Sequence, residues 1–374
     1  MKKIIIIILL LLILSINTKE KSKEETKAIF ISYIEINEYI KGKDINTSKS
    51  NIRRMINNIK NSNFNTIILQ TRSNCDSIYN SKIFPNELGY DYLKYFIDIS
   101  HKNKIKLIAW INPYRVKTTS DIDLIRKDSP AYKYINTDTL YINNGIYLNP
   151  SKKEVEDLII EGVKEVLNYN VDGILYDDYF YPSSDIDIND YNDYIKENGY
   201  ISIQEYHLNI INNMIKRTHE VCKKKNVIFG VSPDGNIENN YNKNMADVKL
   251  WMKSDEYIDF IMPQVYYGFY NSTKAYVNVI KEWENLLVND KIDLYIALAF
   301  YKVGIKDSYA KEGRDEWITN NNIIMREVIL SRNLKNYKGF SLFRYDNVFE
   351  TDHYTNNSIE ELENLKKILN LWYN

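Results

Sequence analysis

Eight short runs rich in β-branched and aromatic residues recur along the chain, and segments with helical patterning separate them. Most of these runs are apolar throughout rather than alternating, which is typical of strands that are covered on both faces. Strands that alternate with helices in this way are expected to pair in parallel in one sheet. The runs cover residues 28–34, 65–70, 106–111, 172–176, 227–232, 259–265, 294–300 and 338–343.

The segments between the runs have the apolar spacing of helices that pack against a sheet. Residues 151–169 place apolar side chains at helical spacing, at Val155, Leu158, Ile159, Val163, Val166 and Leu167. Eight strand and helix units predict an α/β fold, a (β/α)8 TIM barrel, with residues 356–374 forming a C-terminal helix. An open doubly wound sheet is the rival fold. However, no glycine-rich phosphate loop follows the first run, and glycine is scarce, at 12 residues.

The first residues carry a targeting pattern. Lys2 and Lys3 precede eleven apolar residues, Ile4 to Leu14, and a polar stretch follows. A membrane-spanning helix needs ~20 apolar residues, so no stable span is expected here. We therefore predict a signal peptide and polar spacer over residues 1–25, a barrel domain over 26–350, and a C-terminal helix over 351–374 that packs on the barrel. The protein is expected to be exported, to the periplasm, the cell envelope or the medium.

Composition and motifs disfavour several kinds of partner. Lysine and arginine total 49 against 50 acidic residues, so the net charge of −1 gives no reason to expect a nucleic acid partner. The four histidines, at 101, 207, 219 and 353, fall in predicted helices or the tail, and no paired-Cys or His-x-x-x-His spacing exists. No Gly-x-Ser-x-Gly elbow is present either. We expect no cofactor and no metal, although a cation held by Asp177 and Asp178 is an alternative.

Polar side chains follow most of the predicted strands, where the site of a TIM barrel is built. The fourth run ends directly on Asp177 and Asp178, in the stretch VDGILYDDYFYP. Six of the other seven runs are followed by Glu35; by Arg72 and Asp76; by Asn112, Tyr114 and Arg115; by Ser232 and Asp234; by Gln264, Tyr266 and Tyr267; and by Lys302. The sequence therefore predicts a polar site at the mouth of the barrel.

Strand alternation separates the two adjacent acids. Gly173, Leu175 and Asp177 share one face of the fourth strand, and the first two suit a crowded interior. We therefore expect Asp177 at the mouth of the barrel and Asp178 at its rim. Alternatively, one of the two acids caps the next helix or pairs with Arg72 or Arg115.

Two carboxyl groups across a cleft are what hydrolysis of a glycosidic bond requires. Asp177 is the candidate nucleophile or base. The candidate general acids are Asp76, Asp178, Glu35 and Asp234, and we favour Asp76 because the second strand lies across the barrel from the fourth. The nearby cation of Arg72 counts against Asp76, since it would lower a pKa that a general acid needs raised.

With these residues identified, the chain resembles the glycosyl-hydrolase-like family 10 proteins, also called the domain-of-unknown-function 187 family. The resemblance covers most of residues 28–345 and rests on separate motifs, among them NTIILQTRSNCDSIYNSKIFP, LIAWINPYRV, YLNPSKKEV, VDGILYDDYFYP, GVSPDGNI and IDFIMPQVYYGF. It implies a TIM barrel, an envelope or secreted location and action on carbohydrate, including glycan strands of peptidoglycan that have lost their stem peptides. The implied site positions are Arg72, Asp76, Asn112 to Arg115, Asn149, Asp177, Asp178, Gln264 and Tyr266.

One departure from the family pattern affects the second strand end. Related sequences carry Pro after the arginine, whereas Ser73, Asn74 and Cys75 stand between Arg72 and Asp76 here. The loop that holds Asp76 is therefore expected to have a different shape.

The leading hypothesis is an exported glycoside hydrolase that cuts a polysaccharide, with cell-wall glycan as the first candidate. Asp177, Asp178 and Asp76 are the catalytic candidates. The expected sugar contacts are Glu35, Arg72, Asn112, Arg115, Asn149 and Gln264 through polar groups, and Tyr114, Tyr181 and Tyr266 through ring faces. The rival is a carbohydrate-binding protein on the same fold without catalysis, and a metal-dependent deacetylase is a third hypothesis.

Overall fold

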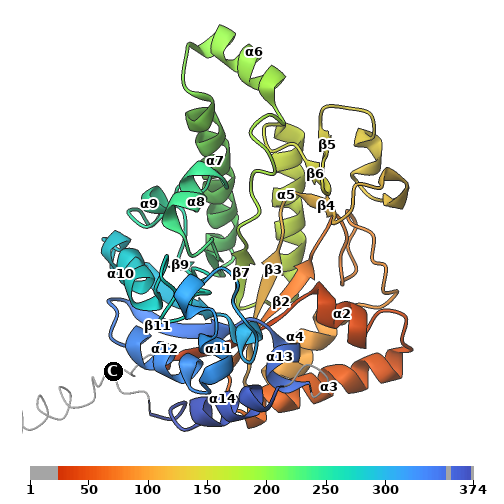
Figure 1. Ribbon diagram of the computed structural model, residues 1–374. Helices are drawn as coiled ribbons and strands as arrows, with labels where there is room; N and C mark the ends of the chain where they lie inside the picture. Colours follow the sequence, from red (N-terminus) through yellow and green to blue (C-terminus); the bar gives the residue numbers. More distant parts are fainter. Residues whose placement is uncertain (1–23, 351–354, 372–374) are drawn as a thin grey trace, which may run out of the picture.

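Eight parallel strands form the centre of the molecule, and they close into a barrel (Figure 1). The computed structural model describes residues 24–350 and 355–371. Each strand begins within two residues of a predicted run, which confirms the TIM-barrel prediction. In their order around the barrel, the strands are β1 (Thr26–Ile31), β2 (Thr66–Arg72), β3 (Lys106–Ile111), β7 (Gly173–Tyr176), β8 (Ile228–Val231), β9 (Phe260–Ile261), β10 (Asp293–Leu298) and β11 (Tyr337–Leu342).

One strand is much shorter than its predicted run. Strand β9 has two residues, although the apolar run continues to Val265. Pro263 has no backbone N–H to donate to a neighbouring strand, which explains why regular pairing stops before it. Beyond the proline, Gln264 makes isolated bridges with Asp234 and Ala297, so the chain still follows the barrel wall toward its mouth.

Helices surround the barrel in Figure 1. The predicted C-terminal helix is present as α14 (Asn356–Lys366), which ends before the end of the predicted segment and packs against α12 and α13. The other helices are α2 (Tyr33–Tyr39), α3 (Ile45–Asn61), α4 (Tyr92–Lys102), α5 (Lys153–Val166), α6 (Ile188–Asn198), α7 (Ile203–Lys223), α8 (Ile237–Asn242), α9 (Val248–Trp251), α10 (Tyr276–Leu286), α11 (Glu316–Thr319), α12 (Ile323–Ser331) and α13 (Tyr345–Phe349).

The predicted signal segment, including the apolar residues 4–14, lies outside the described residues. Within residues 24–350 and 355–371, we find no helix that combines the length and apolarity needed to cross a membrane.

The apolar core has two layers that the barrel wall separates. Leu175 belongs to the cluster inside the barrel, together with Ala28, Phe30, Ile68, Ile108, Trp110, Phe260, Met262 and Ala297. Ile174 and Tyr176 belong to the larger cluster between the strands and the helices. Strand β7 therefore alternates as predicted, and its interior face leads through Leu175 to Asp177.

The barrel carries two insertions at its upper end in Figure 1. A small antiparallel sheet follows β3 and consists of β4 (Arg115–Lys117), β6 (Ile146–Leu148) and β5 (Leu140–Ile142). The sequence pattern did not predict this sheet. The second insertion lies between β7 and α7 and contains α6, which projects away from the barrel beyond the start of α7.

Candidate active site

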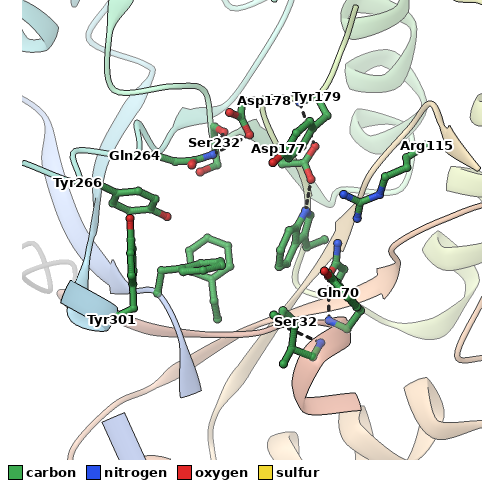
Figure 2. Close-up of a pocket in the computed structure, with 15 residues that line it drawn as sticks. Ser32, Gln70, Arg115, Asp177, Asp178, Tyr179, Ser232, Gln264, Tyr266 and Tyr301 are labelled. Carbon is green, nitrogen blue, oxygen red and sulfur yellow. Dashed lines mark hydrogen bonds between the residues drawn. The ribbon is translucent and has the colours of Figure 1, made fainter. Parts of the chain in front are cut away.

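A cavity of about 310 Å³ opens where the barrel strands end. It takes side chains from most of the strand ends, and Figure 2 shows how they converge. In this view Asp177 and Asp178 lie at the top, the rings of Tyr266 and Tyr301 lie on the left, and Arg115 lies on the right. The lining residues are Phe30, Ser32, Tyr33, Ile34, Gln70, Trp110, Arg115, Asp177, Asp178, Tyr179, Ser232, Gln264, Tyr266, Tyr301 and Phe343.

Asp177 is the more deeply buried of the two acids, with 4% of its surface exposed. Its Oδ2 accepts hydrogen bonds from Trp110 Nε1 at 2.9 Å and from Asn112 Nδ2 at 3.1 Å, and its Oδ1 accepts one from the Tyr179 backbone N–H at 3.4 Å. Burial raises the pKa of Asp177, while the charge of Arg115 and these donors oppose the rise. The hydrogen bonds therefore hold Asp177 in a fixed orientation, and together with Arg115 they offset part of the effect of burial on its charged form.

Asp178 has a different environment, although it is the next residue. Its Oδ1 accepts a hydrogen bond from Gln264 Nε2 at 3.1 Å, and the same amide nitrogen donates to the Ser232 carbonyl at 2.9 Å. Burial and the neighbouring charge of Asp177 raise the pKa of Asp178 to about 7, against the lowering effect of Gln264. Asp178 can therefore hold a proton near neutral pH, which is what a general acid requires.

Aromatic rings form the floor and one wall of the cavity. Phe30 and Trp110 meet edge to face at 5.4 Å between ring centroids, and Phe343 lies 5.6 Å from Phe30. Tyr266 and Tyr301 form one wall, with 5.7 Å between their ring centroids and 85° between their ring planes. Rings with polar groups beside them suit a ligand that has both apolar faces and hydroxyl groups, such as a sugar.

Two buried polar groups in this lining have no hydrogen-bond partner among the described residues. Gln70 accepts a hydrogen bond from the Tyr33 backbone N–H through Oε1 at 2.9 Å, but its Nε2 is unpartnered, as is the Oγ of Ser232. Each of these residues has 2% of its surface exposed. Buried polar groups without partners are costly, so both are candidates for hydrogen bonds to a ligand.

Five of the predicted site residues line this cavity: Arg115, Asp177, Asp178, Gln264 and Tyr266. Asn112 lies behind it and contacts Asp177 rather than the open space. Its Oδ1 also accepts the backbone N–H of Arg115 at 3.1 Å. Asn112 is therefore placed to position the carboxylate, rather than to contact a sugar directly.

Arg72 and Asp76 do not line the cavity. The pairing of β2 with β3 shifts register between Gln70 and Arg72, and this irregularity turns Arg72 toward the helix layer. There its guanidinium lies 3.9 Å from the centroid of the Phe84 ring. Asp76 lines a smaller cavity of about 40 Å³ that meets the first at Tyr33 and Gln70, and it is not among the residues that line the first cavity with Asp177.

Glu35 and Asn149 line neither of these two cavities, because each side chain forms hydrogen bonds within its local structure. Glu35 is fully buried, completes the capping box of α2 with Ser32, and pairs with Arg344 at 2.5 Å. Asn149 is fully buried and bonds to Ser151 and to Asp190 at the start of α6. Neither side chain faces the space in which a sugar would bind.

Tyr114 and Tyr181 line a second cavity that adjoins the first, together with Tyr179 and Asp178. The hydroxyl of Tyr181 donates to Asp187 at 2.5 Å, and its ring stacks on His207 at 4.2 Å. Asp178 lines both cavities, so the expectation that it stands apart at the rim understated its place in the site.

Several lining residues were not among the predicted site residues. Strand alternation could have identified three of them, because Phe30, Gln70 and Trp110 continue the interior faces of β1, β2 and β3. Trp110 is the most informative of these, since it contacts Asp177. Tyr301 and Phe343 follow β10 and β11 and lie next to the cations Lys302 and Arg344 in the sequence, so a search for polar side chains at the strand ends passes over them.

Residues 24–350 and 355–371 hold no group of three or more histidine, cysteine or carboxylate side chains that could bind a metal ion. The two acids of the cavity bond to Trp110, Asn112 and Gln264 instead.

Curated relatives align with most of the chain. A glycosyl hydrolase of Bacillus subtilis strain 168, YngK, is 27% identical over 333 residues, which cover 80% of this chain and 63% of YngK. The glycosyl hydrolase DigH of Escherichia coli K12 is 30% identical over 321 residues, which cover 75% of this chain and 72% of DigH. The chain therefore matches less than two thirds of the length of YngK.

Solved structures share the fold at low sequence identity. The PgaB (BpsB) glycoside hydrolase domain from Bordetella bronchiseptica superposes with a TM-score of 0.59 at 12% identity, covering 94% of this chain and all of that domain. The catalytic domain of a β-amylase from Paenibacillus polymyxa gives 0.56 at 11% identity, covering 92% of this chain and 98% of that one. A sequence profile described as glycosyl hydrolase-like 10 matches residues 25–314, and the chain belongs to this family.

Proposed function

We propose that the protein is a glycoside hydrolase whose reaction takes place between Asp177 and Asp178. The observation that carries the proposal is that two acids with different environments open into one cavity of about 310 Å³. Asp177 accepts several hydrogen bonds, whereas the pKa of Asp178 is raised to about 7 by burial and by the charge of Asp177. The family and the named glycosyl hydrolases among the relatives support the same class of reaction.

In this proposal Asp178 is the general acid. It protonates the oxygen of the leaving group as the glycosidic bond breaks. Asp177 is the nucleophile or base, and its charge also stabilises the positive charge that develops on the sugar ring. Trp110 and Asn112 position Asp177 through their hydrogen bonds, at 2.9 and 3.1 Å.

The remaining lining residues bind the sugar. Gln70 Nε2 and Ser232 Oγ supply buried polar groups without partners for its hydroxyl or amide groups. Arg115 reaches the cavity from the third strand end, and its guanidinium lies 5.5 Å from the centroid of the Tyr179 ring. Tyr266 and Tyr301 offer ring faces and edges to the apolar faces of the pyranose.

The proposed substrate is a polysaccharide, and cell-wall glycan without stem peptides is the first candidate. The family resemblance carried by motifs such as VDGILYDDYFYP supports this choice. Export, which action on a cell wall requires, is supported by the run of apolar residues from Ile4 to Leu14 after two lysines.

Mass spectrometry of products from a panel of denuded and peptide-bearing glycans tests the proposal. The parent protein should release fragments with new reducing ends from at least one glycan of the panel, and the double variant Asp177→Asn, Asp178→Asn should release none. A carbohydrate-binding protein without catalysis would instead bind the glycan and release no fragment in any variant. Loss of activity on chelation, with recovery on adding a divalent ion, would favour a metal-dependent deacetylase.

A further inference from the structure

A second cavity of about 190 Å³ adjoins the first at Asp178 and Tyr179, which line both. Asp177 lines the first cavity and is absent from the lining of the second. The second cavity is lined by Tyr114, Asn144, Tyr147, Asp178, Tyr179, Phe180, Tyr181, Pro182 and Asn244. The two acids are therefore distributed unequally: one lies inside the first cavity and the other lies at the junction.

The lining of the second cavity has the chemistry of a sugar site. Aromatic rings come from Tyr147 on β6 and from Tyr179 and Tyr181 in the loop after β7, and amides come from Asn144 and Asn244. A pyranose ring places its apolar face on an aromatic ring and its hydroxyl or acetamido groups on amides. The insertions after the barrel strands, rather than the barrel itself, supply these groups.

The wall of this cavity is held in place from behind. Tyr181 bonds to Asp187, which also accepts a hydrogen bond from His207 at 2.8 Å, and both Asp187 and His207 are buried. The Tyr181 ring stacks on the His207 ring. A wall built on buried contacts keeps its shape before a ligand arrives, which lowers the entropic cost of binding.

The unequal distribution of the acids gives the bound chain a direction. A general acid must reach the oxygen between the two sugars, whereas the nucleophile or base must reach the anomeric carbon of only one of them. Asp178 lies where both cavities meet and Asp177 faces the first cavity alone. The sugar whose anomeric carbon reacts therefore belongs in the first cavity.

We infer that the second cavity binds the leaving sugar of the cleaved glycan, so that the chain passes over Tyr179 from the first cavity into the second. The inference rests on the proposed function. The C1–O bond breaks at the junction, and the proton of Asp178 goes to the departing oxygen. A water molecule then supplies the hydroxyl group to C1 and returns a proton to the carboxyl pair.

Two kinds of substrate separate the roles of the cavities. Denuded cell-wall glycan has a sugar as its leaving group, which needs both the second cavity and the proton of Asp178. The β-fluorides of N-acetylglucosamine and N-acetylmuramic acid have fluoride as the leaving group, which needs neither. Comparing kcat/KM for the glycan and the fluorides in each variant measures the contribution of the second cavity.

The variants Tyr147→Ala and Asn244→Ala should each lower kcat/KM on the glycan by about tenfold, and leave kcat/KM on the better fluoride within about twofold. Asp178→Asn should lower kcat/KM on the glycan much more than kcat/KM on the fluoride, because only the departure of the sugar needs its proton. Tyr141→Ala is the matched control, because Tyr141 pairs with Tyr147 in the small sheet but does not line the cavity. It should behave as the parent on both substrates.

Other results would overturn the inference in distinguishable ways. If Tyr147→Ala and Asn244→Ala lost equal activity on glycan and fluoride, or none on the glycan, the second cavity would not be the site of the leaving sugar. If the parent turned over neither substrate, the proposed function would be wrong and the inference would fail with it.

Discussion

Acids follow both strand β7 and strand β2, but only those after β7 line the main cavity. At β7 the pairing with β3 is regular, Leu175 points into the barrel, and Asp177 continues on the same face into the cavity. At β2 the register shifts after Gln70, so Gln70 lines the cavity and Arg72 faces the helices. One irregular residue in a strand thus decides whether a polar side chain belongs to the site or to the scaffold.

The largest expected effect separates the acids of these two strand ends. Asp177→Asn keeps the shape of the side chain and removes its charge, so kcat on the cleaved glycan should fall by about 10³-fold. Asp76→Asn should stay within about threefold of the parent, because Asp76 lies in a different cavity. The measurement is kcat for release of reducing ends. Equal losses in the two variants would remove the distinction between the strand ends.

The pH dependence of the reaction tests the role of Asp178, the second of the two acids that follow β7. Burial and the charge of Asp177 raise the pKa of Asp178 to about 7. A general acid works in its protonated form, so kcat/KM should be retained below pH 7 and fall about tenfold per pH unit above it. Asp76→Asn should keep this alkaline limb on the glycan. The parent should lack the limb on the fluoride, because fluoride leaves without the proton of Asp178. An alkaline limb with the same pKa on the fluoride would assign it to another group.

A smaller effect is expected from removing the hydrogen bond between Trp110 on β3 and Asp177 after β7. Trp110→Phe removes the Nε1 donor that lies 2.9 Å from Asp177, so the ionised form of Asp177 loses stabilisation. We expect kcat to fall about tenfold. The acidic limb of the pH profile, where protonation of Asp177 stops the reaction, should move up by roughly one pH unit.

Trp283→Phe is the matched control for this substitution. Trp283 is also buried and donates its Nε1 hydrogen bond at 2.9 Å, but to the Gly235 carbonyl away from the cavity. It should change stability and leave the pH profile in place. A shift of the acidic limb in both variants would mean that the effect on Asp177 is indirect.

The smallest effect on activity is expected from a substitution beside Arg72, on the face of β2 that packs against the helices. A Cβ at Gly162 on α5 would lie 1.9 Å from Arg72 Nη1 and 2.7 Å from the Phe84 ring. Gly162→Ala should therefore lower the free energy of unfolding by about 1–3 kcal/mol, because both neighbours are buried and must shift.

Chemical denaturation of Gly162→Ala and of the exposed control Glu161→Ala measures this effect. Activity per folded molecule should remain at the parent value in both. A selective loss of activity in Gly162→Ala without loss of stability would show that Arg72 belongs to the site after all.

The sequence predicts the barrel well because a short apolar run followed by a helical segment recurs eight times along the chain. Each strand start lies within two residues of its expected position, and the placement of Leu175 on the interior face was also correct. The short β9 differs because Pro263 interrupts a run whose apolar residues alone look continuous. The small sheet after β3 has strands of three residues each, too short for a periodic pattern to reveal.

The site was less predictable than the fold. Five residues were identified because they follow strands, and the structure brings all five to the cavity: Arg115, Asp177, Asp178, Gln264 and Tyr266. Residues such as Arg72 could not be placed, because a register shift between two strands leaves no mark in the sequence of either one. Trp110 was overlooked because an aromatic residue inside a strand looks like ordinary core, and its contact with Asp177 depends on how β3 and β7 pair.

The most direct test of the central claim is the incorporation of oxygen from water labelled with ¹⁸O during cleavage of denuded glycan. If Asp177 and Asp178 hydrolyse the glycosidic bond, the parent should place one ¹⁸O atom in each new reducing end, and Asp177→Asn should yield no labelled ends above background. Cleavage without incorporation, or labelled ends at the parent rate in Asp177→Asn, would contradict the account.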